Sequence, residues 1–371
     1  METQNPSKNQ SEEQKIQIQN DNYDKNYQYQ ALITEEAEYY QVGDKNCINE
    51  FELTKEIGQG SFGKIFLSKR HFYDENNVQQ QELYAIKQFH RGTLDGYRLC
   101  RTDKDKNQKI ITWLDLFYEE IQMYQYLDHP NICKLFEVID SENIEYAYFV
   151  LEYCDLGQIQ IWDIKSQRYK RNQNVFQYLQ NKYEIKEENE QKLVEKICKI
   201  IFFQIFKGVQ YLHNQRNIAN RDIKPDNILC QKQNSDNLQF EDIKLADFST
   251  AVQLEKQNEI VNDCQGTAGI RPPEMQFSTQ GYLAKPTDIW SLGICLFIYI
   301  TEQNAFEGES ELELDINAKN QELKFNEKQF SEELIDLIQL MCKKDNKERI
   351  NIDQALKHSW FQDDVFKEIQ K

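Results

Sequence analysis

The sequence predicts an α+β fold with a small β-rich lobe followed by a larger, mainly helical lobe. Segments that alternate apolar and polar residues, as half-buried strands do, gather before residue 153. Long apolar stripes with helical spacing follow it. The chain has 371 residues, of which 39% are hydrophobic, which suffices for one large two-lobed unit or two domains. We therefore place the lobes at 49–153 and 154–371.

The first 48 residues are expected to form a disordered polar tail. They are rich in Gln, Asn, Glu and Lys and contain few aliphatic residues. Such a segment cannot bury enough surface to offset the entropy of ordering.

The β-rich lobe is predicted from a β-meander and one helix. Strands are expected at 51–57, 64–68, 83–87, 133–139 and 146–151. A helix is expected at 113–127, because its apolar residues form one stripe before His129-Pro130 stops it. The intervening residues 91–109 are polar and basic, and we expect an inserted loop.

The helical lobe is predicted from apolar periodicity. Helices are expected at 193–213, 289–300, 331–342 and 352–358. The second of these is apolar nearly all round, which is typical of a buried central helix. Residues 160–190 are charged, and we expect a solvated connector there.

Composition excludes several classes of function. The net charge is −18 and no long basic block occurs, so nucleic-acid binding is not expected. The nine cysteines are scattered without a C-x-x-C pair, which argues against disulfides or zinc and favours a reducing compartment. No signal peptide, lipidation motif or membrane-spanning stretch is evident, so we expect a cytoplasmic protein with access to the nucleus.

A glycine pattern lies between the first two predicted strands. Gly58, Gly60 and Gly63 would let backbone N–H groups approach phosphate oxygens without side chains in the way. A dinucleotide-binding site would need a helix directly after the glycines, whereas a strand follows here. A flexible hairpin without ligand is the alternative.

A lysine closes the third predicted strand. Lys87 could hold phosphates while paired with a helix glutamate, for which Glu120 is the candidate and Glu119 the competitor. An ordinary edge-strand lysine is the alternative.

Residues 220–227, Asn-Arg-Asp-Ile-Lys-Pro-Asp-Asn, carry the most specific pattern. Asp222 can accept a hydroxyl proton, Lys224 can neutralise a transferring phosphoryl group, and Asn227 can offer an oxygen to Mg²⁺. A polar surface loop is the alternative. Asp247 follows a predicted strand at 243–246 and is a second Mg²⁺ candidate, with a solvated turn as its alternative.

Together these motifs resemble the signature set of eukaryotic protein kinases over residues 51–361. Lys224, two residues after Asp222, is the Ser/Thr-kinase form. Segments 127–138, 222–229 and 243–248 are similar to the calcium/calmodulin-dependent protein kinase kinases. The resemblance implies a two-lobed kinase fold, ATP, Mg²⁺ and a protein Ser/Thr substrate, with a function upstream in a signalling cascade. It also implies a structural ion pair between Glu274, in Pro-Pro-Glu, and Arg349.

The resemblance further implies an adenine site. Its residues are Ile65 and Ala85 above the base, Leu229 below it, Leu151 as gatekeeper, the hinge residues Glu152 and Cys154, and Gln158 or Asp155 at the ribose. Ile57 is a further nucleotide-binding candidate.

Two residues depart from the family pattern. Asn220 stands where the family has His, and we expect looser packing against Phe248 and Tyr124. Ser249 replaces a glycine at a backbone hinge. Neither change removes a group that touches ATP or metal, so activity is favoured over a nucleotide-binding pseudokinase. A metabolite kinase is a weaker alternative.

The resemblance also suggests regulation and specificity. Arg221 usually binds a phosphorylated activation-loop residue, and that position falls on Asp263, so we expect activity without phosphorylation. Asp226 could contact a basic residue upstream of the target hydroxyl. No calmodulin-binding tail is recognisable after 352–361, so calmodulin control is not expected.

Overall fold

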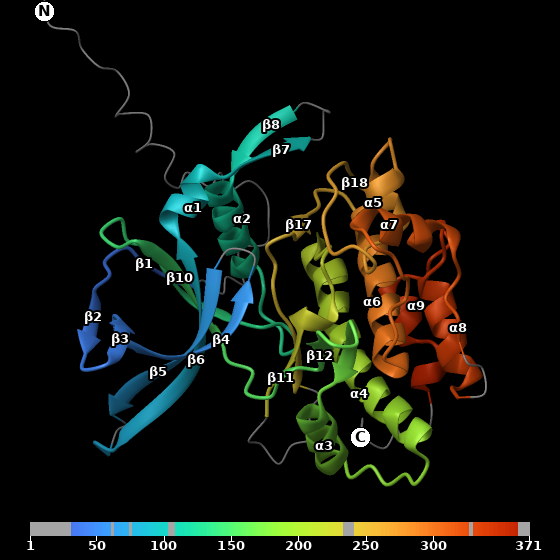
Figure 1. Cartoon of the computed structure of the whole chain (residues 1–371), viewed down its shortest axis with the longest axis horizontal. Helices are drawn as coiled ribbons and strands as arrows, with labels where there is room; N and C mark the ends of the chain where they lie inside the picture. The colour runs from blue at the N-terminus through green and yellow to red at the C-terminus, as the bar shows by residue number, and fades with distance from the viewer. Residues whose placement is uncertain are drawn as a thin grey trace, which may run out of the picture.

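The computed structural model describes residues 31–60, 63–73, 76–102, 108–232, 241–325 and 329–362. Figure 1 shows a twisted β-sheet with helices beside it, next to a larger group of helices. The predicted two-lobed α+β fold is therefore confirmed, with a β-rich N-terminal lobe and a mainly helical C-terminal lobe.

The N-terminal lobe is built on an eight-stranded sheet of order β1-β9-β10-β6-β5-β4-β3-β2. The strands are β1 (Leu32–Thr34), β2 (Tyr39–Val42), β3 (Lys45–Ile48), β4 (Phe51–Gly60), β5 (Gly63–Tyr73), β6 (Gln79–His90), β9 (Leu135–Ile139) and β10 (Tyr146–Glu152). Neighbouring strands are antiparallel except β1 and β9, which are parallel.

One face of this sheet packs on α2 (Trp113–Gln125). The ring of Phe117 on this helix lies 5.0 Å from the ring of Phe89 and 4.9 Å from that of Phe149. A capping box between Thr112 and Asp115 satisfies backbone N–H groups at the start of the helix. The packing fixes α2, and therefore its glutamates, relative to β6.

Residues 31–48 correct the prediction of a disordered tail. β1 joins one edge of the sheet, while β2 and β3 extend the other edge. Thr34 Oγ1 donates a hydrogen bond to Glu137 Oε1 at 2.5 Å, and Ala31 and Ile48 are buried. The prediction was wrong here because pairing with an existing sheet supplies contacts that this polar segment could not make alone. Residues 1–30 lie outside the described residues.

The predicted loop at 91–109 contains regular structure. It forms α1 (Arg91–Gly96), β7 (Arg98–Thr102) and β8 (Gln108–Thr112), and the two strands make a hairpin. The ring of Tyr97 stacks on Trp113 at 4.2 Å, so the hairpin is anchored to the start of α2. The loop prediction was therefore wrong for the described part of this insert, and residues 103–107 lie outside it.

The C-terminal lobe contains helices, short turns and small sheets. Its helices and turns are α3 (Gln173–Lys182), α4 (Glu190–Gln210), η1 (Tyr211–Arg216), η2 (Pro225–Asn227), α5 (Pro273–Phe277), α6 (Ala284–Thr301), α7 (Glu311–Asn320), α8 (Glu332–Met341), α9 (Ile352–Leu356) and η3 (Ser359–Phe361). Its strands are β11 (Gly157–Gln158), β12 (Gln160–Asp163), β13 (Arg168–Arg171), β14 (Ile218–Ala219), β15 (Ile228–Cys230), β16 (Ile243–Leu245), β17 (Val252–Gln253), β18 (Ile260–Val261) and β19 (Tyr282–Leu283).

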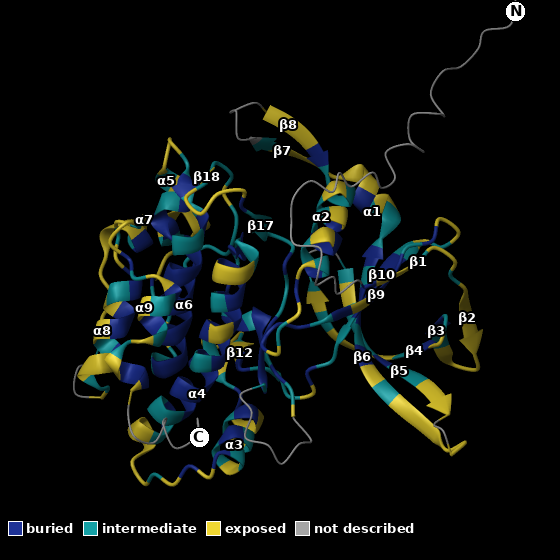
Figure 2. Ribbon diagram, turned by 180° about the vertical axis from the view of Figure 1, so that it is seen from behind, coloured by how far each residue is buried: buried dark blue, intermediate teal, exposed yellow. Residues whose placement is uncertain are grey.

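The centre of this lobe is formed by α4 and α6. Figure 2 shows α6 almost wholly in the colour of buried residues, as the apolar stretch at 289–300 predicts. A side chain at Gly293 would place its Cβ 2.6 Å from Cys342 Sγ, so glycine is required where α6 meets the end of α8. These packed helices form a rigid base for the loops above them.

The charged segment at 160–190 also differs from its prediction. It forms the β12–β13 hairpin and α3, whose Val175 and Leu179 are buried. The carboxylate of Asp242, fully buried, accepts hydrogen bonds from Tyr178 and Tyr183 and pairs with Lys182 Nζ at 2.6 Å. The prediction of a solvated connector was wrong because these polar groups are satisfied internally.

All nine cysteines lie in described positions and are free thiols, as their spacing predicts. Within the described ranges, no group of His, Cys, Asp or Glu side chains is arranged to hold a metal by protein ligands alone. None of the helices in the described part of the chain is long and apolar enough to cross a membrane.

Candidate active site

The glycine pattern lies where β4 turns into β5. Gly58 pairs with Ile65 and Gly60 with Gly63, whereas residues 61–62 lie outside the described part of the chain. A Cβ on Gly63 would lie 1.8 Å from the carbonyl oxygen of Gln88, so this glycine is required by the closeness of β6. A Cβ on Gly60 would lie 3.8 Å from Lys87 Cε, which places this turn beside the lysine.

Lys87 lies at a junction of three elements. Its Nζ is 3.2 Å from Glu120 Oε1 on α2 and 3.9 Å from Asp247 Oδ1, which follows β16. Burial opposes the charge on the lysine, but the two carboxylates outweigh it and raise its pKa. Lys87 is therefore a buried, charged ammonium rather than a solvated edge lysine.

The competition between the two helix glutamates has a clear outcome. Glu120 is buried and pairs with Lys87, whereas both oxygens of Glu119 accept hydrogen bonds from Arg101 at 2.8 Å. Burial raises the pKa of Glu120 to about 7, against the opposing charge of Lys87. Adjacent residues on one helix thus serve the site and the inserted hairpin separately.

The predicted catalytic pair lies within hydrogen-bonding distance. Lys224 Nζ is 2.6 Å from Asp222 Oδ2, and the other oxygen of Asp222 accepts a hydrogen bond from Thr267 Oγ1 at 2.7 Å. Lys224 also lies 3.3 Å from the same threonine oxygen. Burial raises the pKa of Asp222, and Lys224 and Thr267 only partly offset this effect.

Thr267 was not among the residues predicted for the site. It follows Gly266 and precedes Pro-Pro-Glu, so its place in the motif order was the available signal. Gly266 has φ +80°, and a side chain there would place its Cβ 2.6 Å from the carbonyl oxygen of Arg221. Glycine therefore lets the threonine approach the catalytic loop closely.

The two predicted metal ligands have ordered side chains. Asn227 donates its amide N–H to the carbonyl oxygen of Asp222 at 3.1 Å, which orients its own side-chain oxygen. Asp247 adopts φ +62° and accepts the N–H of Ser249 at 3.2 Å. Burial disfavours its charge, but Lys87 and Ser249 outweigh this effect and lower its pKa. An ionised carboxylate and an amide oxygen are a donor set that fits Mg²⁺.

The two departures from the family pattern are both integrated into the site. Asn220 is fully buried, donates to the carbonyl oxygen of Asp247 at 2.9 Å, and accepts the N–H of Asp222 at 3.1 Å. The ring of Phe248 is buried and lies 5.3 Å from that of Tyr124. A polar link between the catalytic loop and Asp247 therefore stands where looser packing was expected.

Arg221 and Asp263 form the pair that the spacing suggests. Arg221 Nη1 lies 2.6 Å from Asp263 Oδ1, and its Nε donates to the carbonyl oxygen of Thr250 at 2.7 Å. Burial disfavours charge on Asp263, but Arg221 outweighs this effect and lowers its pKa. The contact joins the catalytic loop to the segment that carries Thr267.

The residues predicted around adenine come from both lobes. Ala85 pairs with Leu67 and Leu151 across the sheet, and Ile65 pairs with Lys87. Leu229 lies in β15, beside Gln158 of β11. In the hinge, Glu152 pairs with Lys244 at 3.0 Å, and the carbonyl oxygen of Cys154 accepts the N–H of Gly157 at 3.0 Å. Ile57 is exposed on β4.

The ribose position stays open between two residues. Gln158 donates to the carbonyl oxygen of Asp226 at 3.3 Å, whereas Asp155 accepts the N–H of Lys232 at 2.7 Å. Both side chains therefore have partners within the protein.

The ion pair predicted to be structural is present. Arg349 binds both carboxylate oxygens of Glu274, with Nη2 2.7 Å from Oε2. Its Nη1 also donates to the carbonyl oxygen of Pro286 at 3.1 Å, so the pair joins α5 to the start of α6.

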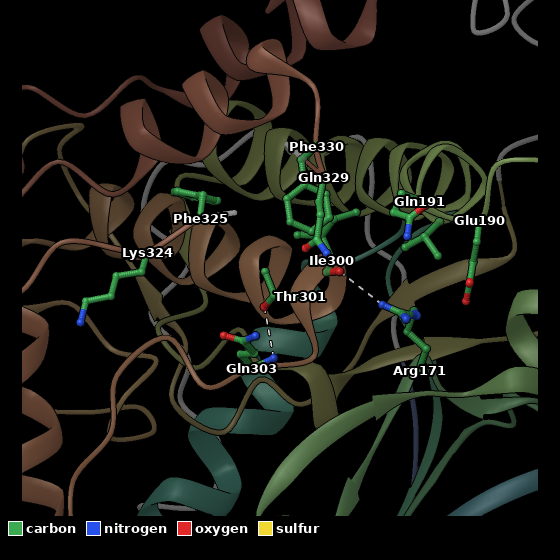
Figure 3. A pocket seen from close by; sticks show the side chains of 11 residues that line it. Arg171, Glu190, Gln191, Ile300, Thr301, Gln303, Lys324, Phe325, Gln329 and Phe330 are labelled. Carbon is green, nitrogen blue, oxygen red and sulfur yellow. Dashed lines mark hydrogen bonds between the residues drawn. The ribbon is translucent and has the colours of Figure 1, made fainter. Parts of the chain in front are cut away.

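A separate cavity of about 350 Å³ lies in the C-terminal lobe (Figure 3). It is bounded by the start of α4, the end of α6 and the side chains of Phe325 and Phe330. None of the residues predicted for the active site lines this cavity. This cavity is therefore separate from the candidate active site.

A family model of the protein kinase domain matches residues 51–361, and the chain belongs to this family. It is 28% identical over 324 residues to a calcium/calmodulin-dependent protein kinase kinase of Caenorhabditis elegans, covering 84% of this chain and 52% of that protein. It is 30% identical over 316 residues to calcium-dependent protein kinase 6 of Plasmodium berghei (strain Anka), covering 85% of this chain and 17% of that protein.

A third similar protein is the probable serine/threonine-protein kinase MARK-C of Dictyostelium discoideum. The identity is 26% over 325 residues, which cover 87% of this chain and 34% of that protein. The chain thus spans about half, or less, of the length of these relatives.

Proposed function

We propose that this chain transfers the γ-phosphate of ATP to Ser or Thr hydroxyl groups of a protein. The observation that carries the proposal is the junction at Lys87, whose ammonium lies 3.2 Å from Glu120 and 3.9 Å from Asp247. Three segments distant in sequence meet there in a buried place. Family membership over residues 51–361 supports ATP as the phosphate donor.

In this proposal the N-terminal lobe holds the phosphates of ATP. Lys87 contacts the α- and β-phosphates, and Glu120 keeps its ammonium in position. The turn at Gly58, Gly60 and Gly63 covers the phosphates with backbone N–H groups. The raised pKa of Lys87 keeps its charge available throughout the neutral range.

Asp222 orients the acceptor hydroxyl and takes its proton. Thr267 and Lys224 hold the two carboxylate oxygens, so the geometry is set before substrate arrives. Because a protonated Asp222 cannot accept a proton, the rate should fall as the pH drops through its raised pKa. Lys224 compensates the charge of the transferring group.

Asn227 and Asp247 would hold Mg²⁺, because their side-chain oxygens are hard ligands. Asn227 is oriented by its hydrogen bond to the carbonyl oxygen of Asp222, and Asp247 by the N–H of Ser249. A bound divalent cation neutralises charge on the phosphates. The lowered pKa of Asp247 supplies the ionised ligand that such a cation needs.

The alternative of a pseudokinase scaffold rests on Asn220 and Ser249. The hydrogen bonds of Asn220 argue for activity, because they connect Asp222 to Asp247 rather than separating them. Ser249 likewise supports Asp247 through its backbone N–H.

The test is transfer of radiolabelled phosphate from Mg·ATP to a mixed protein substrate. We expect the wild type to transfer label, and Asp222→Asn and Lys87→Met each to abolish transfer while remaining folded. No transfer by the wild type, together with a rise in melting temperature on adding Mg·ATP, would indicate a nucleotide-binding scaffold instead.

The similarity to a kinase kinase also supports a function upstream of other kinases. Incubation with catalytically inactive kinase domains would test this, with label expected in their activation segments. Unpaired thiols suit a reducing compartment, so the site of action that we propose is the cytoplasm, with access to the nucleus. Imaging of the tagged full chain would test that location.

A further inference from the structure

The β12–β13 hairpin lies at the boundary between the two lobes, as both views of the ribbon show for β12 (Figure 1 and Figure 2). β12 packs against η2, the turn that contains Asp226 and follows the catalytic Asp222 by a few residues. A protein substrate that reaches Asp222 therefore has to pass close to this hairpin.

One face of the hairpin contacts Asp226 and occupies part of its hydrogen-bonding capacity. Tyr169 donates a hydrogen bond from its phenol to Asp226 Oδ2, and Gln158 donates to the carbonyl oxygen of the same residue. Burial and then the charge of Asp226 raise the pKa of Tyr169, so its hydroxyl remains a proton donor at neutral pH. The hydrogen bond from Tyr169 occupies one of the two carboxylate oxygens of Asp226, so it competes with a guanidinium that would bind both.

The same face carries an aromatic neighbour. Side chains alternate between the two faces of a strand, and Trp162 is the cross-strand partner of Tyr169. The two rings lie 4.9 Å apart in an edge-on arrangement. Trp162 is 39% exposed, and Ile164 at the turn is 78% exposed, so this part of the hairpin presents apolar side chains to solvent.

Three cations of the hairpin lie near carboxylates of the C-terminal lobe, whereas Lys165 is exposed in the turn beside Ile164. Lys170 and Arg171 both pair with Glu302, and Arg168 lies 3.8 Å from Glu307. Arg171 also donates to the carbonyl oxygens of Tyr299 and Ile300 at the end of α6. These contacts anchor the hairpin to the C-terminal lobe at the end of α6.

We propose that the Trp162–Tyr169 face of the hairpin, with Ile164 at its tip, is a substrate-docking surface that selects a protein segment with an apolar side chain near the target Ser or Thr. The occupant is the protein substrate, because Tyr169 contacts Asp226, which lies in the same loop as the catalytic Asp222. The inference rests on the proposed kinase function and names its specificity. It replaces the earlier expectation that Asp226 selects a basic residue.

The experiment is phosphorylation of a positional peptide library, with Ser or Thr fixed and each flanking position varied. The wild type should prefer Leu, Ile or Phe over Ala by about tenfold at one position. Apolar contacts with the additional methylene groups of these side chains can supply that discrimination. Ile164→Ser and Trp162→Ser should each reduce that ratio at least threefold. The matched control is Ile110→Ser on β8, which is also exposed, at 67%, and should leave the ratio unchanged.

Tyr169→Phe provides a second, independent readout. It removes the hydrogen bond to Asp226 while keeping the ring, so a preference for Arg near the target hydroxyl should emerge. Ile164 is nearly free of contacts in the fold, so a folding defect cannot explain a changed ratio in its variant.

The outcomes separate the two proposals. A wild type that phosphorylates the library without apolar selection, or with selection for Arg, overturns the docking surface but leaves the kinase function standing. Unchanged ratios in both hairpin variants do the same. If those variants instead dissociate an oligomer without changing the ratio, the surface binds a second copy and the proposal fails. No phosphorylation of any peptide or protein overturns both proposals.

Discussion

At the scale of single residues, the site depends on side chains whose neighbours fix their charge. Asp222 and Asp247 are both half-buried carboxylates, yet their pKa values move in opposite directions. Burial dominates at Asp222 and raises its pKa, which suits a proton acceptor. Lys87 and a backbone N–H dominate at Asp247 and keep it ionised, which suits a cation ligand.

Glu119 and Glu120 form a natural pair of variant and control. Glu120→Gln removes the carboxylate that holds Lys87, and we expect kcat/KM for ATP to fall by about 100-fold. Glu119→Gln removes only the contact with Arg101, and we expect a change below about threefold. Steady-state kinetics with varied ATP checks both values. Equal effects of the two substitutions would contradict the assignment of Glu120.

A second residue-scale prediction concerns Asp263. Asp263→Ala leaves Arg221 buried without its carboxylate partner, and we expect a loss of about 3 kcal/mol in the free energy of unfolding. Transfer activity should fall at least tenfold, because the segment carrying Thr267 loses an attachment. Urea unfolding and initial rates measure the two effects.

The control for this prediction keeps the charge. Asp263→Glu should retain most activity, and phosphatase treatment of the wild type should leave its rate unchanged. Full activity of Asp263→Ala would show that Asp263 is only a loop charge.

At the scale of elements, the sequence predicted what periodicity can reveal. The strands of the β-meander, α2, α4 and α6 were anticipated within a few residues, because each buries an apolar face. The order and spacing of the motifs also predicted that Lys87, Asp222 and Asp247 belong to one site.

The polar inserts were not anticipated, because their order comes from specific partners. The hairpin β7–β8 rests on the stacking of Tyr97 and Trp113, and α3 rests on the buried Asp242. A charged sequence looks solvated unless its partners are known. For the same reason, nothing in the sequence indicated that Tyr169 would reach Asp226.

An element-scale prediction tests the anchoring of α3. Tyr183→Phe removes a hydroxyl that donates to the fully buried carboxylate of Asp242. We expect a loss of about 1–3 kcal/mol in the free energy of unfolding, because the carboxylate loses a donor that water cannot replace. Tyr73→Phe, at a residue that is 66% exposed, is the control and should change stability by less than about 0.5 kcal/mol. Equal stabilities of the two variants in urea would support the earlier expectation that residues 160–190 form a solvated connector.

At the scale of the whole molecule, the two lobes share one hydrophobic cluster, and polar and aromatic contacts lie beside it. Between α2 and β9, the ring of His129 stacks on Tyr211 at 5.0 Å, and the N–H of Asp128 donates to the hydroxyl of the same tyrosine. The Nδ1 of His129 accepts the N–H of Asn131 at 3.1 Å, so this ring is needed in its neutral form.

Acid should therefore weaken the connection between the lobes. Burial, with Lys207 and Lys244 nearby, lowers the pKa of His129 from 6.5 to about 4. The unfolded chain then binds this proton first, so stability is complete above pH 6.5 and is lost as the pH falls toward 4. Because the ring is partly exposed, we expect a loss of about 1 kcal/mol at pH 5, half of the full linkage effect.

The measurement compares urea unfolding at pH 7.5 and pH 5 for the wild type and His129→Asn. Asparagine offers an acceptor to the N–H of Asn131 but has no charge to gain. The decrease between the two pH values should be smaller in the variant by about 1 kcal/mol. Identical decreases in the free energy of unfolding would show that His129 does not contribute to the loss of stability in acid.

The ion pair between Arg221 and Asp263 affects how long the negative charge opposite Arg221 persists. A phosphate at such a position is added and removed by other enzymes, whereas a carboxylate encoded in the chain lasts as long as the chain does. We propose that a kinase held in this way is active from its synthesis onward and is controlled by degradation, by restricting its substrates or by covering its surface. Its output would therefore follow its abundance in the cell, so that the history of its expression serves as the signal.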